Sequence, residues 1–261
     1  ILNEEDKNRV IQLALTTRNT KKTSAPYRHV LLYGPPGTGK TMIARKLAEC
    51  SSMDYAIMSG GDVAPLGEDA VNQLHALFRW AASSRKGLLL FIDEAEAFLS
   101  SRTSSSGKSD EGVSIHIRHA LNALLYQTGT QSTTFMLVLA TNRPEDLDTA
   151  VLDRMDVSHY IGYPECNERK QLISLYYNTH IINNIHKTTI DTLTIQYINK
   201  LSEKLVGFSG REISKLFIAV RYAIMLNPNS ENNKNVMETL VTDVSITKIY
   251  EHQQKIGFIN N

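Results

Sequence analysis

A glycine-rich loop between an apolar segment and a helical one restricts the possible folds of this chain more than any other feature. Residues Val30–Tyr33 form a short apolar run typical of a buried strand, and Met42–Cys50 repeats apolar side chains at helical spacing. The eight residues between them match G-x-x-x-x-G-K-[ST] at every fixed position: Gly34, Pro35, Pro36, Gly37, Thr38, Gly39, Lys40 and Thr41. Strand, loop and helix in this order predict the first βα unit of a parallel sheet.

The same loop predicts a binding site for a polyphosphate. Glycines let the backbone wrap closely around phosphate groups with its N–H groups inward. The start of the next helix, which includes Met42, adds its positive end. We expect Lys40 to reach the β- and γ-phosphates and the Thr41 hydroxyl to bind Mg²⁺. The alternative, a glycine turn with an incidental lysine, does not account for the full match in this context, so ATP and Mg²⁺ are the expected cofactors.

Short apolar segments and helical segments alternate up to about residue 163. The predicted strands are Val30–Tyr33, Tyr55–Met58, Leu88–Ile92 and Phe135–Ala140, and the predicted helices are Asn3–Leu15, Met42–Cys50, Asp69–Ser83 and Val113–Tyr126. Thr16–Arg28 is expected to be a polar connector and Ser100–Asp110 a mobile surface loop. The alternation predicts an α/β fold with helices on both faces of a parallel sheet.

After Pro164 the strand signals stop. Four further helices are predicted, over Glu165–Thr179, Thr192–Leu205, Gly210–Leu226 and Val236–Gln254. We therefore predict two domains, an α/β nucleotide-binding core over residues 1–163 and a small helical lid over residues 164–261.

Composition excludes several other classes of protein. Apolar residues make up 42% of the chain, which excludes global disorder, and 28 basic against 27 acidic residues give a net charge of +1, which does not support nucleic-acid binding through bulk charge. The longest apolar run, Leu88–Ile92, is too short to cross a membrane. Two cysteines are too few for a disulfide scaffold. Because the chain begins at Ile1 rather than Met, we expect a fragment, with any targeting or membrane segment upstream.

Polar residues follow two of the predicted strands. Asp93 and Glu94 come directly after Leu88–Ile92, and Asn142 follows Phe135–Ala140. Asp93 is expected to hold Mg²⁺ through water, Glu94 to polarise the water that attacks the γ-phosphate, and Asn142 to orient that water. The alternatives are a solvated acidic strand end and a turn asparagine. Glu96 is expected to serve local structure or a neighbouring subunit.

Three segments together resemble a known family. Gly34–Thr41, Phe91–Glu94 and Ala140–Pro144 are similar to the Walker A, Walker B and sensor-1 motifs of the AAA+ ATPases, and the resemblance extends over essentially the whole chain, including the lid. It implies a core with a parallel five-stranded sheet, ATP hydrolysis, and assembly into a homo-oligomeric, hexameric ring in which each subunit supplies an arginine to its neighbour's site.

The resemblance also implies roles for two arginines. Asp148–Asp156 corresponds to the family's arginine-finger segment but keeps a single arginine, so Arg154 is the finger candidate. Phe208–Ile213 resembles the sensor-2 segment, where many members carry Ala-Asp in place of Arg211-Glu212. Arg211 is expected to contact the γ-phosphate in its own subunit. The alternatives are an ordinary surface ion pair for Arg154 and a solvated helix residue for Arg211.

Further segments resemble one subgroup, the mitochondrial "ATPase family AAA domain-containing protein 3" group. The segments that carry this resemblance are Thr17–Lys22, Tyr55–Gly67, Gly87–Leu99 and His252–Lys255. The resemblance implies a location at the mitochondrial inner membrane with this domain in the matrix, and a role in organising that membrane or the nucleoid. Membrane contact is expected only through the missing N-terminal region.

The central-pore segment differs from that of protein-threading relatives. Val63–Gly67 has no aromatic residue where they have one, so Leu66 is the candidate pore residue. The leading hypothesis is a ring ATPase that remodels a protein partner at this pore. Three alternatives stay open: an ATP-gated scaffold with little hydrolysis, a P-loop kinase, and a DNA-handling ATPase. His116 and His119 lie one helical turn apart but have no further ligands to suggest zinc.

Overall fold

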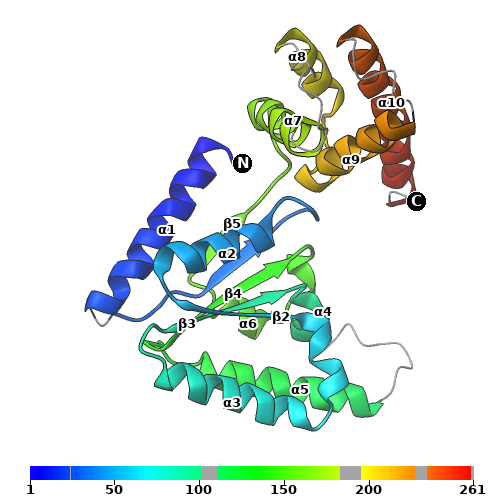
Figure 1. Ribbon diagram of the computed structural model, residues 1–261. Coiled ribbons are helices and arrows are strands. Elements are labelled where there is room, and N and C mark those ends of the chain that lie inside the picture. The colour runs from blue at the N-terminus through cyan, green and yellow to red at the C-terminus, as the bar shows by residue number, and fades with distance from the viewer. Residues whose placement is uncertain (24, 101–110, 183–194, 227–233, 260–261) are drawn as a thin grey trace. The chain divides into compact units, whose positions relative to one another are not determined.

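The computed structural model describes all residues except 24, 101–110, 183–194, 227–233 and 260–261 (Figure 1). The chain forms two compact units. One, which we call the sheet unit, comprises Glu5–Ile161; the other, the helical unit, comprises Gly162–Asn261 together with Ile1–Glu4. The predicted division into domains 1–163 and 164–261 stays a prediction.

A five-stranded parallel sheet forms the centre of the sheet unit. The strands are β1 (Val30–Tyr33), β2 (Asp54–Ser59), β3 (Leu88–Asp93), β4 (Phe135–Thr141) and β5 (Val157–Tyr160). They lie in the order β2-β3-β4-β1-β5, and every neighbouring pair is parallel. β3 and β4 are buried except for the last residue of β3, as their continuous apolar runs predict. The predicted fold class, with its five-stranded parallel sheet, is confirmed.

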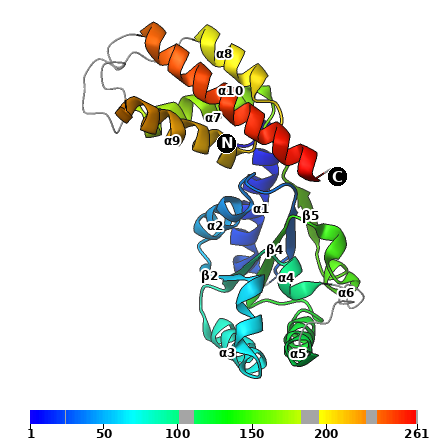
Figure 2. The same cartoon turned by 90° about the vertical axis from the view of Figure 1, so that its right-hand side faces the viewer.

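Helices cover both faces of this sheet (Figure 2). They are α1 (Glu4–Thr23), α2 (Lys40–Ser51), α3 (Asp69–Ser83), α4 (Glu96–Leu99), α5 (Glu111–Gln127) and α6 (Thr149–Leu152), with 3₁₀ turns at Gly60–Asp62, Ala64–Leu66 and Pro144–Asp146. α3 and α5 pack side by side against one face, where Phe78 and Leu124 join Leu90 and Leu137 in the main apolar core. α2 covers the opposite face together with α1.

Two expectations about this unit were wrong. The predicted connector Thr16–Arg28 is helical as far as Thr23, because packing of α1 overrides the local polarity: Thr17 is buried, and its hydroxyl lies 3.9 Å from Sδ of Met136 in β4. The Thr16 and Thr20 hydroxyls bond to the carbonyls of Gln12 and Thr16, at 2.9 Å and 2.8 Å. The strand β5 has no counterpart among the strands predicted from apolar runs. It lies at the sheet edge, and of its four residues only His159 is buried, so it has no apolar run to mark it. Of the predicted loop Ser100–Asp110, residues 101–110 lie outside the described part.

The helical unit contains α7 (Cys166–His180), α8 (Ile195–Lys204), α9 (Gly210–Leu226) and α10 (Lys234–Ile259). α9 has the predicted bounds, and it packs against both α7 and α10. A separate apolar core is built around Tyr177 and Phe217, whose rings meet edge to face at 6.1 Å. None of the helices in the described parts of either unit is long and apolar enough to traverse a bilayer.

Candidate nucleotide-binding site

The loop after β1 has the backbone shape that its glycines predict. Gly34, Gly37 and Gly39 all have positive φ, at 141°, 78° and 104°. Gly34 also lies against the chain just after β5, since a Cβ atom there would be 2.2 Å from the carbonyl oxygen of Ile161. That close approach fixes the start of the loop against the sheet.

The first turn of α2 is open to an anion. The helix begins at Lys40, its N-cap Gly39 provides no side-chain hydrogen bond, and no acidic residue lies in the first turn. Its first N–H groups therefore have no side-chain cap, and they carry the positive end of the helix dipole. Together with the three glycines, this is a cradle that fits phosphate oxygens. Met42 is in the same turn and is 75% exposed.

Lys40 connects this loop to the end of β4. Its side chain is buried, and its Nζ donates hydrogen bonds of 2.8 Å to the carbonyl oxygens of Gly34 and Pro35 and to Oδ1 of Asn142. Thr38 closes the loop by donating to the same Pro35 carbonyl at 3.0 Å. The structure thus places the predicted lysine and the predicted amide in direct contact.

Thr41 and Asp93 form a second contact between predicted site residues. The Thr41 hydroxyl donates to Oδ2 of Asp93 at 2.6 Å, and Oδ1 of the same carboxylate accepts from the Glu94 backbone N–H at 3.0 Å. A hydroxyl and a carboxylate are oxygen ligands of the kind Mg²⁺ prefers, next to a loop that fits phosphate. These two residues therefore fit the predicted cation.

Glu94 has an unusual backbone. Its φ is +49°, in the left-handed region that non-glycine residues rarely adopt, and its side chain is exposed at the end of β3. The backbone of Gly60, just after β2, packs directly against that of Glu94. A Cβ atom on Gly60 would be 2.3 Å from the Glu94 carbonyl oxygen, so only glycine permits this close approach. Gly60 is a site residue that the sequence reasoning missed. The Gly60-Gly61 pair after a predicted strand is the signal that marks such a close backbone approach.

Glu96 links the ends of β3 and β4. Its Oε2 accepts a 2.6 Å hydrogen bond from the Thr141 hydroxyl, which in turn accepts from the Arg143 backbone N–H at 2.9 Å. Ala95 N–H also donates to the Ala140 carbonyl at 2.9 Å. These bonds bracket Asn142 on both sides. Glu96 thus makes a local structural contact, one of the two roles expected of it, while a contact with a neighbouring subunit stays a prediction. Thr141 is a further supporting residue that no pattern in the sequence marks.

The two predicted arginines lie outside this cluster of contacts. Arg154 follows α6, and its Nη1 donates to the Ala150 carbonyl, while its Nε is buried without a partner among the described residues. Arg211 is the second residue of α9 in the helical unit, and its side chain is exposed. Their roles as arginine finger and sensor 2 stay predictions. The candidate pore residue Leu66 is 41% exposed at the end of a 3₁₀ turn.

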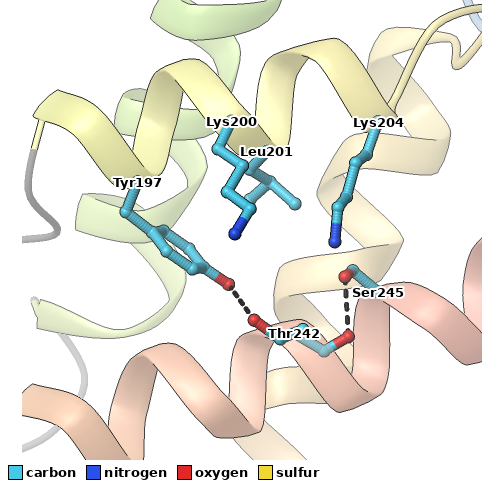
Figure 3. Close-up of a pocket in the computed structure, with 6 residues that line it drawn as sticks. All are labelled: Tyr197, Lys200, Leu201, Lys204, Thr242 and Ser245. Carbon is cyan, nitrogen blue, oxygen red and sulfur yellow. Dashed lines mark hydrogen bonds between the residues drawn. The ribbon is translucent and has the colours of Figure 1, made fainter.

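Two other candidates do not form comparable sites. The helical unit contains a hollow of about 50 Å³. Figure 3 shows its lining residues, Tyr197, Lys200, Leu201, Lys204, Thr242 and Ser245. The hollow has room for about three water molecules, and its Ser245 hydroxyl already donates to the Thr242 carbonyl at 2.7 Å. Within the described residues, no three histidine, cysteine or acidic side chains are grouped closely enough to hold a metal ion, so His116 and His119 have no additional ligands there.

A loop that fits phosphate oxygens lies between a strand and a helix and next to an acidic strand end. This combination defines a nucleotide-binding protein of the P-loop class. Within that class, the model of the ATPase family associated with various cellular activities (AAA) matches residues 30–163. The chain belongs to this AAA family.

Curated relatives carry the subgroup name that the sequence resembles. The chain is 44% identical to "ATPase family AAA domain-containing protein 3-B" of Xenopus laevis over 99% of its length. It is 43% identical to "ATPase family AAA domain-containing protein 3A" of Homo sapiens over 96% of its length. It covers 43% and 42% of these two proteins, so it spans less than half the length of each. The resemblance to this group is confirmed.

A solved structure shows the same fold. The AAA domain of FIGL-1, crystallised in complex with ADP, superposes with a TM-score of 0.72 over 94% of this chain and 81% of that one. The two sequences are 23% identical, so the likeness concerns the fold alone.

Proposed function

We propose that this chain is an ATPase that binds Mg²⁺-ATP at the loop after β1 and hydrolyses it. The observation that carries the proposal is the contact of Lys40 with both the loop carbonyls and Asn142, next to the bonded pair Thr41 and Asp93. Four groups with distinct roles in phosphoryl transfer thus converge, two from the start of α2, one from the end of β3 and one from the residue after β4. Membership of the AAA family and the ADP-bound fold neighbour support nucleotide binding at this place.

Each residue has a chemical task in this proposal. Thr41 directly and Asp93 through water would hold Mg²⁺, whose charge would offset the charge that develops on the phosphate oxygens. Lys40 exchanges its carbonyl and amide partners for phosphate oxygens. Glu94 polarises the attacking water, and Asn142 orients it. Because Gly60 and Glu96 fix the backbone around these two residues, the water is held in one place before the reaction.

Assembly completes the proposal. We place Arg154 of one subunit in the site of its neighbour, in a homo-oligomeric ring of six, where a guanidinium stabilises charge in the transition state. Arg211 contacts the γ-phosphate from the helical unit of the same subunit. Hydrolysis would then depend on ring formation and would change the position of the helical unit with nucleotide state.

The whole protein is proposed to use this cycle to remodel a protein partner at the pore. On the resemblance alone, we place it at the mitochondrial inner membrane with this domain in the matrix, in membrane or nucleoid organisation. The absence of an aromatic residue around Leu66 argues for a partner that is pushed or bound rather than gripped through aromatic side chains.

Phosphate release without any acceptor substrate tests the proposal. Release that is lost in Glu94→Gln, while ATP binding is kept, supports an ATPase. No release at high protein concentration would overturn it and would favour a kinase or an ATP-gated scaffold. Size analysis of Glu94→Gln with ATP tests the ring, since trapped ATP is expected to stabilise a particle of six chains. If the Glu94→Gln chain stays monomeric with ATP at all protein concentrations, the proposed ring is contradicted.

A further inference from the structure

The start of α9 is held by a capping box. Ser209 and Glu212 have the spacing S-x-x-E, and the Glu212 carboxylate oxygen Oε2 accepts from both the backbone N–H and the hydroxyl of Ser209 at 2.9 Å. The Glu212 backbone N–H donates in return to the Ser209 hydroxyl oxygen Oγ at 3.3 Å. This arrangement fixes the first helical turn at both of its ends.

The other oxygen of the same carboxylate is bound by a residue from the last helix. Nδ1 of His252, in α10, lies 3.0 Å from Oε1 of Glu212. Burial raises the pKa of Glu212, but hydrogen bonds from Ser209 and His252 outweigh it and lower that pKa below its usual value. The ionised carboxylate only accepts hydrogen bonds, so the histidine nitrogen Nδ1 must carry the proton.

The ring of His252 is also packed against the turn that precedes α9. Its centre lies 4.4 Å from that of Phe208, at an angle of 33°. Its Nε2 would be 3.5 Å from a Cβ atom on Gly207, a residue with φ of +83°. The side chain of His252 is only 12% exposed. One imidazole therefore contacts the chain on both sides of the first turn of α9.

Arg211 lies inside this clamped turn. It follows Ser209 by two residues and precedes Glu212, so its backbone is fixed by the capping box and by His252. Arg211 itself is exposed, and its side chain makes no hydrogen bond or ion pair with the described parts of the chain. A long cation on a fixed helix start is preorganised to bind an external anion, because little backbone freedom remains to be lost.

We propose that His252 is a positioning residue for Arg211, acting through Glu212 and the turn at Gly207-Phe208. The inference rests on the proposed function, in which Arg211 contacts the γ-phosphate. It gives a task to the segment His252–Lys255, which resembles the subgroup but has no place in the nucleotide site itself. The competing explanation is that His252 only stabilises the packing of α10 on α9.

A double-mutant cycle on the full chain separates these explanations. His252→Ala is expected to lower kcat for ATP hydrolysis roughly tenfold, since a small misplacement of a charge-stabilising group has a large effect on rate. In an Arg211→Ala background the same change is expected to alter kcat by less than about twofold, because the group it positions is gone. An equal loss of kcat in both backgrounds would overturn the inference and leave the proposed ATPase intact. If Arg211→Ala alone leaves kcat unchanged, both the role of Arg211 and the inference fail.

A pair of conservative variants tests the geometry even if His252→Ala does not fold. The amide nitrogen of asparagine takes about the place of histidine Nδ1, and that of glutamine about the place of Nε2. His252→Asn is therefore expected to retain most of the kcat, and His252→Gln to lose it, with similar melting temperatures. The matched control is Gln253→Ala, at the exposed neighbouring position on α10, which is expected to match the unmodified chain. Equal kcat for the asparagine and glutamine variants would contradict the positioning role.

Discussion

Lys40 and Asn142, which are 102 positions apart in the chain, share a hydrogen bond of 2.8 Å between Nζ and Oδ1. The bond joins the first turn of α2 to the end of β4, and it follows from the strand order, which places β4 directly beside β1. Three oxygen acceptors thereby hold the Lys40 side chain in a fixed orientation, and its ammonium group does not extend into solvent. In the proposed function, phosphate oxygens would replace these partners, and the amide of Asn142 would then be free to bind the attacking water.

Replacing the amide tests this exchange. Asn142→Ala is expected to lower kcat roughly 10²-fold, because the attacking water loses its orienting group. The Kd for ATP is expected to change little, since Lys40 keeps its place beside the loop carbonyls. Steady-state hydrolysis and equilibrium titration with a fluorescent ATP analogue measure the two quantities. A large loss of affinity with unchanged kcat would show that Asn142 serves nucleotide binding instead.

Gly60 and Gly61 provide a matched pair for the Glu94 backbone. A methyl group on Gly60 would lie 2.3 Å from the Glu94 carbonyl oxygen, whereas one on Gly61 would lie 3.8 Å from Ser59 Oγ, an ordinary contact. Gly60→Ala is therefore expected to displace Glu94 and to lower kcat at least tenfold, with ATP binding kept. Gly61→Ala is expected to have near-normal kcat. Equal rates for the two variants would mean that the position of Glu94 is not set from the β2 side.

The contrast between these two glycines also shows which features of the fold and the site could be predicted from the sequence. The apolar runs predicted β1, β3 and β4, the loop pattern predicted Lys40 and Thr41, and the end of an apolar run predicted Asp93, because strand burial and phosphate binding impose local residue patterns. The glycine pair after β2 marks a close backbone approach but does not say to which residue, since the contact between Gly60 and Glu94 depends on how two strand ends approach each other. The edge strand β5 and the extension of α1 were missed because the pairing of β5 with β1 and the packing of Thr17 against β4 override local polarity.

The stability of the sheet unit is expected to depend on pH through His29. Its Nδ1 accepts a 3.0 Å hydrogen bond from the Leu137 backbone N–H, and its ring stacks on Phe135 at 5.5 Å. Burial lowers the pKa of His29 below 6.5, although the charge of Asp156 opposes this shift. The unfolded chain then binds a proton more readily than the folded one. The stabilising contribution is therefore complete above pH 6.5 and is lost as the pH falls from there toward the lower folded pKa.

Urea unfolding at pH 7.5 and 5.5 measures this effect. The control is His29→Asn, which keeps an acceptor for the Leu137 N–H but does not titrate in this range. It is expected to be less stable than the unmodified chain at pH 7.5 and to lose less free energy of unfolding on going to pH 5.5. The same loss in both chains would assign the pH dependence to other groups.

A mixture of two inactive chains tests whether Arg154 acts across subunits. In its own chain, Arg154 donates to the Ala150 carbonyl and has no bond to the nucleotide site among the described contacts. Arg154→Ala and Glu94→Gln are each expected to lose at least 10²-fold in kcat. In a mixed ring, an Arg154→Ala chain still has Glu94, and a Glu94→Gln neighbour still supplies Arg154. Random equimolar mixing would restore about a quarter of the sites, because a ring interface pairs two different surfaces.

The control for this mixture replaces the Glu94→Gln chain with one that carries both substitutions. That chain supplies no arginine, so mixing it with Arg154→Ala is expected to restore nothing. Because each chain folds with the same sheet and loop, differences in recovered phosphate release report on the arginine alone. If the first mixture also stays inactive while size analysis shows mixed rings, then Arg154 works within its own subunit or has a purely structural role through the Ala150 carbonyl. Recovery that rises with total protein concentration would in addition tie hydrolysis to assembly.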